Sequence, residues 1–431
     1  MTFKGGVRLP EGKRLSRDEP IREIPPPSRL LVSLAQNAGA PPQPVVEPGD
    51  QVERGQVIAR PTGTISAFLH APASGRIVSL KNFPHPVLGQ APALELETLP
   101  DSVGEKRLLP LPEGEISPES IRKRVLEAGI VGMGGAAFPT HIKLSPPGPI
   151  DYAVVNGAEC EPYLTVDHRL LIENPAGILR GLELMMKAVG AARGILAVEE
   201  NKRVAAGELL QLVSTRRDVE VRFLEVKYPQ GSEKQLLESL LDREVPPGRL
   251  PADVGCVVQN VHTVLAVAQA VDLGMPLTAR VVTVSGPAVE NPGNFLVRLG
   301  TPFSTLLAAA GGLKEGRLQL LAGGPMMGPA QATLEASVLK GTSGLLALPA
   351  PRRRRNLACL RCGACLRACP MGLFPCEVAR AAARGDVEEF RRQGGLNCLE
   401  CGCCSFVCPS GRDLVQMIQM GKEQLRLGEG S

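Results

Sequence analysis

Near its C-terminus the chain reads Cys359-Leu-Arg-Cys362-Gly-Ala-Cys365-Leu-Arg-Ala-Cys369-Pro370, and it later reads Cys398-Leu-Glu-Cys401-Gly-Cys-Cys404-Ser-Phe-Val-Cys408-Pro409. Both stretches follow C-x2-C-x2-C-x3-C-P, and each cysteine of the second lies 39 residues after its counterpart. Ten of the 12 cysteines fall in this region. Such clustering, in a chain with no apolar leader segment, favours metal or redox chemistry over disulfide bonds.

This spacing is typical of two-cluster bacterial ferredoxins, in which three neighbouring thiolates hold one cubane and the fourth crosses to the other. We therefore expect [4Fe-4S] cluster 1 at Cys359, Cys362, Cys365 and Cys408, and [4Fe-4S] cluster 2 at Cys398, Cys401, Cys404 and Cys369. Zinc is the alternative, although zinc sites usually pair two C-x2-C knuckles across a spacer. Cys376 and Cys403 lie outside the repeat and are expected to pack as small side chains. Helices are expected over residues 377–392 and 413–425.

The composition limits the remaining function classes. The 431 residues suffice for about three domains, and the net charge of +4 and 3% aromatic content argue against nucleic-acid binding. The polar N-terminus does not resemble a signal peptide, so we expect a cytoplasmic protein. The most apolar stretches, 261–271 and 305–313, are shorter than the roughly 20 residues of a membrane span. We expect no transmembrane segment, and any membrane association should be peripheral.

A glycine-rich loop lies upstream of the cysteines. Ser117, Pro118 and Gly129 bracket a predicted helix, which leads into Gly132-Met-Gly134-Gly135-Ala-Ala-Phe138-Pro-Thr-His-Ile-Lys143. Backbone that a ligand can approach closely, followed by one cation, suits a phosphate group. An ordinary helix-ending turn with a solvated lysine is the alternative.

Strands and helices alternate after this loop, which predicts a parallel sheet covered by helices. Strands are expected at 152–155, 195–198 and 219–226, and helices at 175–189 and 204–213. The first strand ends in Asn156-Gly-Ala-Glu159-Cys-Glu161, and open α/β sheets bind ligands at such edges. Tyr228-Pro-Gln-Gly231-Ser-Glu233 follows the third strand, and Asn260-Val-His262-Thr263 precedes a further helix.

Taken in order, these segments resemble the flavin-binding subunit of respiratory complex I, from Gly132 to Thr263. The resemblance implies that Gly132, Gly134, Gly135 and Lys143 line FMN and its phosphate, and that Asn156, Gly231 and Asn260 contact the flavin. It also implies that Phe138, Glu159, Tyr228 and Glu233 face NADH. Two positions depart from that family: Ala158 replaces a usual acidic residue, and Ala137 replaces a frequent glycine. His141 and His262 are expected to be loop and packing residues.

The flanking segments resemble known modules. Residues 47–58 and 70–78 resemble the two halves of a biotinyl/lipoyl-type barrel sandwich, but no lysine lies between Gly55 and Arg76 to carry a prosthetic group, so a structural or docking role is expected.

Expected strands at 279–289 and 293–299, with Thr301 capping a short helix, resemble a ligand-binding β-grasp domain. The turn 323–328 should place its methionines in the core. Arg352 to Arg355 are either a solvated linker or a docking patch for an acidic redox partner or anionic headgroups.

The whole order predicts a multidomain α/β plus α+β protein. The expected domains are a barrel sandwich (1–100), an FMN/NADH-binding α/β domain (115–275), a soluble-ligand-binding β-grasp domain (276–348) and a two-cluster ferredoxin domain (349–431). This order resembles the C subunit of the Rnf-type ion-translocating ferredoxin:NAD oxidoreductases. The resemblance implies a peripheral subunit on the cytoplasmic face of the membrane, which exchanges electrons with NAD(H) through FMN and with an iron-sulfur partner subunit. The other subunits would move Na+ or H+.

Electron counting supports a flavin, because NAD(H) exchanges a hydride, clusters take single electrons, and a flavin does both. One alternative is a flavin and iron-sulfur cobalamin reductase, against which the N-terminal sandwich argues. A second is a flavin-less iron-sulfur adapter, suggested by Ala137 and Ala158. DNA binding through Arg352 to Arg355 is a third.

Overall fold

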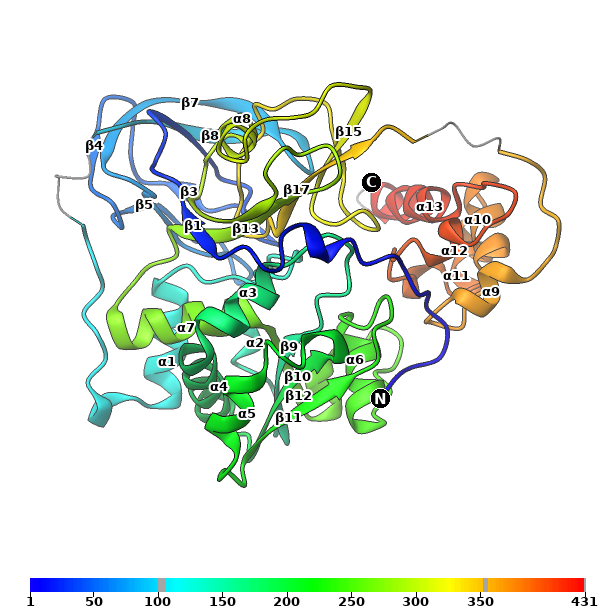
Figure 1. Ribbon diagram of the computed structural model, residues 1–431, viewed down its shortest axis with the longest axis horizontal. Coiled ribbons are helices and arrows are strands. Elements are labelled where there is room, and N and C mark those ends of the chain that lie inside the picture. The colour runs from blue at the N-terminus through cyan, green and yellow to red at the C-terminus, as the bar shows by residue number, and fades with distance from the viewer. Residues whose placement is uncertain (100–104, 352–355, 430–431) are drawn as a thin grey trace.

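The computed structural model describes residues 1–99, 105–351 and 356–429, so the predicted arginine linker, Arg352 to Arg355, lies outside the described residues. Figure 1 shows two β-rich bodies side by side above an α/β body, with a helical C-terminal module at one end. No helix among the described residues is both long and apolar enough to cross a membrane.

The N-terminal body is a barrel sandwich of two small sheets with strand orders β2-β8-β7-β4 and β3-β5-β6. Apolar side chains of both sheets share one core that includes Leu30, Ile58, Leu69, Ile77 and Leu94. The strands are β2 (Arg29–Ser33), β3 (Gln43–Pro44), β4 (Gln51–Val52), β5 (Val57–Arg60), β6 (Leu69–His70), β7 (Gly75–His85) and β8 (Gly89–Thr98). The turn-bounded strand pairs expected from the sequence are confirmed.

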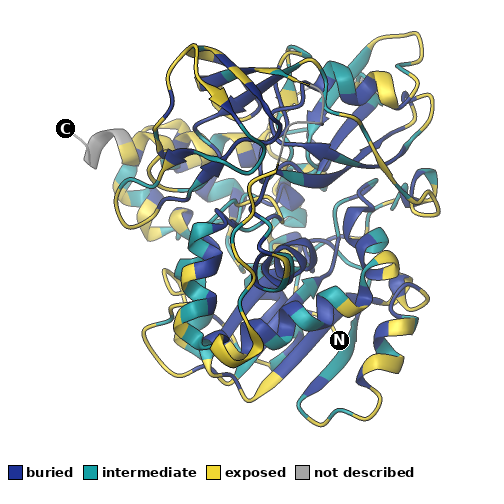
Figure 2. Ribbon diagram, turned by 90° about the vertical axis from the view of Figure 1, so that its left-hand side faces the viewer, coloured by how far each residue is buried: buried dark blue, intermediate teal, exposed yellow. Residues whose placement is uncertain are grey.

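The α/β body contains an all-parallel sheet of order β11-β10-β9-β12. Alternate residues point to opposite faces, so Val155 packs under the helices of one face and Val154 under α6 on the other. The strands are β9 (Tyr152–Gly157), β10 (Arg193–Glu199), β11 (Val219–Leu224) and β12 (Cys256–Asn260). Figure 2 shows β9, β10 and β12 largely buried among half-exposed helices, as the predicted alternation requires, whereas β11 at the edge of the sheet is mostly half-buried.

The helices of this body begin and end with local signals. Ser117 and Ser120 form a reciprocal capping box at the start of α1, and Gly190 ends α4 in the left-handed conformation. The helices are α1 (Pro118–Glu127), α2 (Thr140–Lys143), α3 (Val166–Glu173), α4 (Pro175–Val189), α5 (Gly207–Val213), α6 (Glu233–Leu241) and α7 (Val261–Leu273). The helix expected from residue 204 begins only at Gly207, because a short turn of 3-10 helix, Glu200–Lys202, precedes it.

The third body is a six-stranded mixed sheet of order β1-β14-β13-β17-β15-β16, with α8 (Phe303–Ala309) beside it. The strands are β1 (Ile21–Glu23), β13 (Ala279–Ser285), β14 (Gly293–Arg298), β15 (Leu318–Ala322), β16 (Ala330–Gln331) and β17 (Gly344–Pro349). β13 pairs antiparallel with β14 and parallel with β17. β1, which comes from the N-terminal segment, extends the sheet by pairing with β14.

Three local predictions in this body are wrong. The strand expected over 279–289 ends at Ser285, since Gly286 takes a φ of +115°. Thr301 does not cap α8, because its hydroxyl donates to Arg298 O and Pro302 occupies the cap position. Met327 is exposed rather than in the core.

The C-terminal module repeats its backbone as well as its cysteines. Residues 39 apart share left-handed φ angles at three pairs: Arg361 and Glu400, Gly363 and Gly402, and Gly372 and Gly411. Its helices are α9 (Ala364–Ala368), α10 (Pro375–Ala383), α11 (Val387–Arg392), α12 (Cys403–Phe406) and α13 (Leu414–Glu429). The single helix expected over 377–392 is wrong, because Gly385, with a φ of +67°, separates α10 from α11.

The N-terminal segment joins the module to the α/β body (Figure 1). Val7 and Tyr228 exchange backbone hydrogen bonds of 2.8 and 2.9 Å, and Gly6 N donates to Ala368 O at 3.0 Å. Gly6 has a φ of +75°, and a β-carbon there would lie 2.5 Å from Tyr228 O. Only glycine fits this junction.

We therefore predict that Gly6→Ala loosens the junction. A left-handed alanine costs about 1 kcal/mol, and the overlap with Tyr228 O adds to that. Hydrogen exchange of the Tyr228 amide should accelerate by about tenfold or more. Gly89→Ala is the matched control, because Gly89 has the same φ but open space around it. Equal protection of Tyr228 in Gly6→Ala and in the unchanged chain would contradict this assignment.

Candidate functional site

The predicted site residues gather where the parallel strands end. The loop after α1 is closed by Gly132 N, which donates to Phe138 O at 2.8 Å, and by Ala137 N, which donates to Gly132 O at 3.1 Å. Gly134 and Gly135 are exposed at its tip, and their amides donate to no backbone carbonyl of the described residues. A β-carbon on Gly135 would meet open space. The loop therefore presents free amides, as a phosphate-binding loop requires.

Two asparagines at strand ends hold the neighbouring loops. Asn260 caps α7, because its Oδ1 accepts from His262 N at 2.9 Å, and it lies against the loop, since a β-carbon on Gly134 would be 3.3 Å from Asn260 Cβ. Asn156 Nδ2 donates to Gly231 O at 2.8 Å. The structure thus brings together two sets of predicted flavin contacts, Gly134 with Asn260 and Asn156 with Gly231.

Lys143 and Glu233, predicted to serve the phosphate and NADH, form an ion pair with each other. Lys143 Nζ also donates to Val258 O at 3.0 Å. Lys143 ends α2 and Glu233 begins α6, so the pair spans the edge of the sheet. An anionic group bound at the loop would compete with Glu233 for the lysine.

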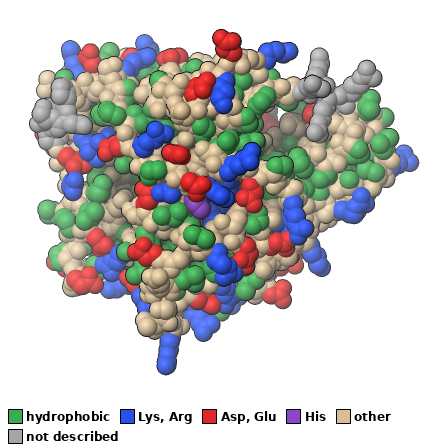
Figure 3. All heavy atoms as spheres, viewed as in Figure 1, with side chains coloured by type: hydrophobic (Ala, Val, Ile, Leu, Met, Phe, Trp, Pro, Cys, Tyr) green, Lys and Arg blue, Asp and Glu red, His purple; other side chains and the backbone are tan. Residues whose placement is uncertain are grey.

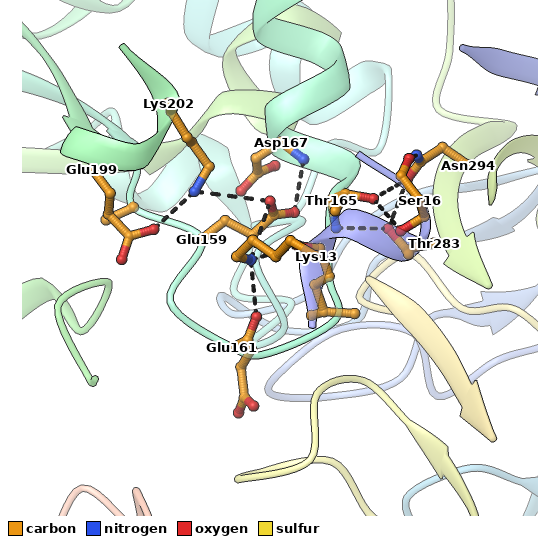
Figure 4. A network of polar contacts seen from close by, with 12 residues as sticks. Lys13, Ser16, Glu159, Glu161, Thr165, Asp167, Glu199, Lys202, Thr283 and Asn294 are labelled. Atoms are coloured by element: carbon orange, nitrogen blue, oxygen red, sulfur yellow. Dashed lines mark hydrogen bonds and ion pairs between the residues drawn. The ribbon is translucent and has the colours of Figure 1, made fainter. Parts of the chain in front are cut away.

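A buried charge network lies beside these loops (Figure 4). Lys202 Nζ lies 2.8 Å from Glu199 Oε2 and 4.0 Å from Glu159 Oε2, and Lys13 Nζ lies 3.7 Å from Glu159 Oε2. Lys13 also donates to Leu164 O at 2.6 Å and Glu161 O at 3.0 Å. Burial lowers the pKa of Lys13. Burial has the same effect on Lys202, but the carboxylates of Glu199 and Glu159 outweigh it, so the pKa of Lys202 is raised overall. Glu159, predicted to face NADH, is therefore held inside the protein by two lysines.

The network also contains a third carboxyl group, Asp167, which no motif in the sequence indicates. Its backbone amide donates to Glu159 Oε1 at 2.9 Å, and its Oδ2 accepts from Asn260 Nδ2 at 2.7 Å. A second chain of contacts, through Ser16, Thr165, Thr283 and Asn294, ties the N-terminal segment to the six-stranded sheet. Lys13 likewise belongs to no motif: it lies in a short 3-10 helix, and Asp167 lies in the first turn of α3, so no pattern in the sequence indicates either residue.

Glu161 and Tyr228 lie between the α/β body and its neighbours. Glu161 accepts from the amides of Met326 and Met327 at 3.0 Å each, and burial raises its pKa to about 7 against the effect of those amides. Tyr228 is buried, and it lines a small, partly open cavity together with Leu9, Lys13, Cys160 and Glu199. The predicted NADH contact Phe138 is half-buried on the glycine loop.

The four cysteines predicted for cluster 2, Cys369, Cys398, Cys401 and Cys404, line one partly open cavity. Burial raises the pKa of Cys398 to about 11 and that of Cys404 to about 12, so iron would have to displace protons on binding. Among the described residues, no three thiol, imidazole or carboxylate groups converge closely enough for a single metal ion. Four thiolates are the usual ligand set of a [4Fe-4S] cluster, so the donor types that line this pocket suit one.

The cysteines predicted for cluster 1 lie nearer the surface. Cys359 and Cys362 are exposed, whereas Cys365 and Cys408 are half-buried. The two repeats share a local contact, because Arg361 N donates to Cys359 Sγ at 3.4 Å and Glu400 N donates to Cys398 Sγ at 3.3 Å. Hydrogen bonds from backbone amides to cysteine sulfur are found around iron-sulfur clusters. Each repeat therefore has one backbone amide that donates to the sulfur of its first cysteine.

The cavity of the second repeat adjoins the α/β body. Gln235 Nε2, on α6, donates to Pro370 O at 3.3 Å. Cys403 Sγ lies 3.9 Å from Tyr228 O, and Cys403 is fully buried beside Tyr228 and Cys401. Of the first repeat, Cys369 lines this cavity, whereas Cys359 and Cys362 are exposed.

Three family models match the chain. The Nuo51 FMN-binding domain matches residues 125–269, the RnfC barrel sandwich hybrid domain matches residues 1–99, and the SLBB domain matches residues 281–330. An NAD+-reducing [NiFe]-hydrogenase, solved in the H2-reduced state, shares the fold with a TM-score of 0.50 and 22% identity over 72% of this chain. This chain covers 62% of that hydrogenase chain. The fold and the site thus define an oxidoreductase subunit built around an FMN-binding domain.

Curated relatives narrow the class to one family. The C subunit of the proton-translocating ferredoxin:NAD(+) oxidoreductase complex of Clostridium ljungdahlii is 41% identical over 87% of this chain and 83% of its own length. The C subunit of the Na(+)-translocating complex of Acetobacterium woodii is 38% identical over 89% and 88%. The C subunit of the ion-translocating oxidoreductase complex of Rhodobacter capsulatus is 40% identical over 98% and 83%. The chain belongs to this family of C subunits, and the resemblance inferred from its sequence is confirmed.

We predict that Lys13→Met destabilises the fold by about 3 kcal/mol, since it removes one of the two cations that face the buried Glu159. The free energy of unfolding, measured by urea denaturation, checks this value. Lys123→Met is the matched control, because Lys123 is an exposed partner of Glu127 and should change stability by less than about 0.5 kcal/mol. If both variants were equally stable, Lys13 would have no role in neutralising Glu159.

Proposed function

We propose that the chain is the NAD(H)-, FMN- and iron-sulfur-containing electron-transfer subunit of a membrane-bound complex that couples ferredoxin:NAD+ electron transfer to ion translocation. The observation that carries the proposal is the contact between a cysteine-lined cavity and the α/β body that bears the glycine loop. The relatives named above are subunits of such complexes, in which either H+ or Na+ is translocated. The family favours this function over cobalamin reduction.

FMN fits the exposed amides of Gly134 and Gly135 with Lys143 as the cation for its phosphate. When bound, FMN supplies the conversion between hydride transfer and single-electron transfer. In our proposal Gly132, Gly134, Gly135, Asn156, Gly231 and Asn260 position the flavin. Phe138, Glu159, Tyr228 and Glu233 shape the nicotinamide side, and Glu159 acts there through its charge rather than as an exposed contact.

Two [4Fe-4S] clusters would form a path for electrons between the flavin and a partner protein. The set Cys369, Cys398, Cys401 and Cys404 lies beside the α/β body, so cluster 2 exchanges electrons with the flavin. The set Cys359, Cys362, Cys365 and Cys408 includes two exposed thiols, so cluster 1 exchanges electrons with a partner. The reduction potentials of the clusters set the dominant direction of electron flow. The fold can tune these potentials through burial of the clusters and hydrogen bonds to their sulfur atoms.

The surface around cluster 1 suits an iron-sulfur partner subunit. Figure 3 shows apolar side chains gathered on the C-terminal module, where Leu357, Leu360, Leu366 and Phe406 are among the exposed residues. The segment 356–376 contains Arg361 and Arg367 but no acidic residue, so an acidic partner would be favoured. We place the subunit peripherally on the cytoplasmic face of the membrane, where the other subunits of the complex anchor it.

The remaining domains would frame these sites. The antiparallel β13–β14 pair, α8 and the parallel β17 support a soluble-ligand-binding β-grasp domain at 276–348. The proposed limits of the other domains are 1–100 for the sandwich, 115–275 for the flavin domain and 349–431 for the ferredoxin domain. The sandwich has no lysine between Gly55 and Arg76, so we assign it a docking role.

The flavin assignment predicts that Lys143→Met weakens FMN binding by about tenfold or more, because a charge-assisted contact to the phosphate is lost. Fluorescence titration of the full chain with FMN measures the change. Lys123→Met, which changes an exposed side chain of α1 paired with Glu127, should bind FMN as the unchanged chain does. NADH added anaerobically to the FMN-loaded, iron-reconstituted chain should bleach the flavin. If the chain takes up iron-sulfur clusters but binds no FMN, the proposal is contradicted, and the alternative function of a flavin-less iron-sulfur adapter is favoured.

The cluster assignment predicts different results for two adjacent cysteines. Cys404→Ser should lower the iron content of the reconstituted chain from about eight to about four per chain, because Cys404 is assigned to cluster 2. Cys403→Ser should keep about eight irons, because Cys403 is assigned to packing against Tyr228. Iron and sulfide analysis with EPR of the reduced chain measures both. Loss of iron in Cys403→Ser instead, or zinc in place of iron, would show the assignment to be wrong.

A further inference from the structure

The buried Asp167 differs from the other carboxyl groups of the network in its partners. Glu199 and Glu159 each face the ammonium group of Lys202, and Glu159 faces Lys13 as well. Asp167 Oδ2 accepts from Asn260 Nδ2, whereas its Oδ1 is buried without a hydrogen-bond partner among the described residues. The residue is 7% exposed. A buried carboxylate oxygen with no donor is unfavourable, but a protonated oxygen there is not charged.

The charges around Asp167 favour its protonated form. Burial and the carboxylate of Glu159 raise the pKa of Asp167 to about 7, against the opposing effects of Asn260, Lys202 and Arg280. Arg280 is itself buried and donates to three backbone carbonyls, those of Val281, Lys340 and Met133. Its guanidinium therefore acts on Asp167 only through a longer-range electrostatic attraction, which is weaker than a direct ion pair.

Asp167 is one side chain away from the glycine loop. It binds Asn260, and Asn260 lies against Gly134. Both of these residues are assigned to the flavin, so a proton released by Asp167 appears beside the place where the reaction occurs. Figure 4 shows Glu159 and Lys202 beside Asp167, whose backbone amide donates to Glu159 Oε1.

The proposed function needs a proton at this place. Two electrons that arrive singly from the clusters reduce NAD+ to NADH only if one proton is taken up for each pair, since NAD+ + 2e− + H+ gives NADH. We propose that Asp167 is the group that holds this proton and releases it to the flavin and nicotinamide site. The O–H bond of Asp167 breaks, the proton and the electron pair end in the new C–H bond of NADH, and the carboxylate regains a proton from solvent between turnovers. This inference rests on the proposed function.

The test compares Asp167→Asn with Asp18→Asn in the full chain. Asparagine keeps the size of the side chain and an oxygen for Asn260 but holds no transferable proton. Asp18 is an exposed residue paired with Arg17, so its change is the matched control. Burial also raises the pKa of Glu161 to about 7, so infrared difference spectra between pH 5 and pH 8 should show the carbonyl stretches of two protonated carboxyl groups titrating in the unchanged chain and in Asp18→Asn. In Asp167→Asn only one of these two bands should remain.

Stability gives a second readout that needs no cofactor. A raised pKa means that the folded chain holds a proton that the unfolded chain has lost above about pH 4, so stability falls as pH rises toward 7. Asp167→Asn removes this loss, so its Tm relative to the unchanged chain should rise between pH 5 and pH 8. The Tm difference for Asp18→Asn should stay constant.

The kinetic readout uses chains loaded with iron, sulfide and FMN, with a one-electron chemical reductant and NAD+. Asp167→Asn should lower kcat for NADH formation by about 100-fold and leave KM for NAD+ unchanged. An unchanged kcat, or infrared difference spectra of Asp167→Asn that keep both titrating bands of the unchanged chain, overturns the inference. If the unchanged chain binds clusters but forms no NADH, the proposed function fails, and that result is separate from any effect of Asp167.

Discussion

The neutralisation of Glu159 inside the protein is the constraint on which the arrangement of the other elements depends. A carboxylate removed from water is strongly destabilising unless cations and donors surround it. Lys202 comes from the turn after β10, and Lys13 comes from a segment 146 residues away in sequence. The N-terminal segment is therefore required at the edge of the sheet, and its path sets how the three larger bodies meet.

That path explains why the junctions lie at the candidate site. Before Lys13, the segment binds Tyr228 and Ala368, and after it, Ser16 binds Thr165 and β1 joins the six-stranded sheet. One strand of chain thus fixes the C-terminal module, the α/β body and the six-stranded sheet around the same strand ends. Electron transfer between the proposed clusters and the proposed flavin would need fixed separations, and the contacts of this N-terminal segment would help to hold those separations constant.

Local patterns in the sequence predicted most elements but few side-chain partners. The alternation of apolar runs located β9, β10 and β11, and the cysteine spacing selected four residues that line one cavity. The break at Gly385 was missed because the Ala- and Arg-rich composition on both sides is helical. Lys13 and Asp167 were missed for a different reason: their partners are set by the packing of distant segments, about which periodicity carries no information.

The two departures from the complex I flavin subunit have structural explanations. Ala137 adopts a φ of +50°, a conformation that costs a non-glycine residue about 1 kcal/mol, yet its amide binds Gly132 O and its carbonyl accepts from Ala38 N of the sandwich. Two hydrogen bonds offset that strain, so the loop keeps its shape without glycine. Ala158 packs among Val154, Leu236 and Leu237, where a carboxylate would be buried without a cation. The carboxyl groups near this strand end are instead those of Glu159, Glu161 and Asp167. Lysines or hydrogen-bond donors contact each of them. Loss of a carboxylate at position 158 is thus compatible with retention of the flavin loop.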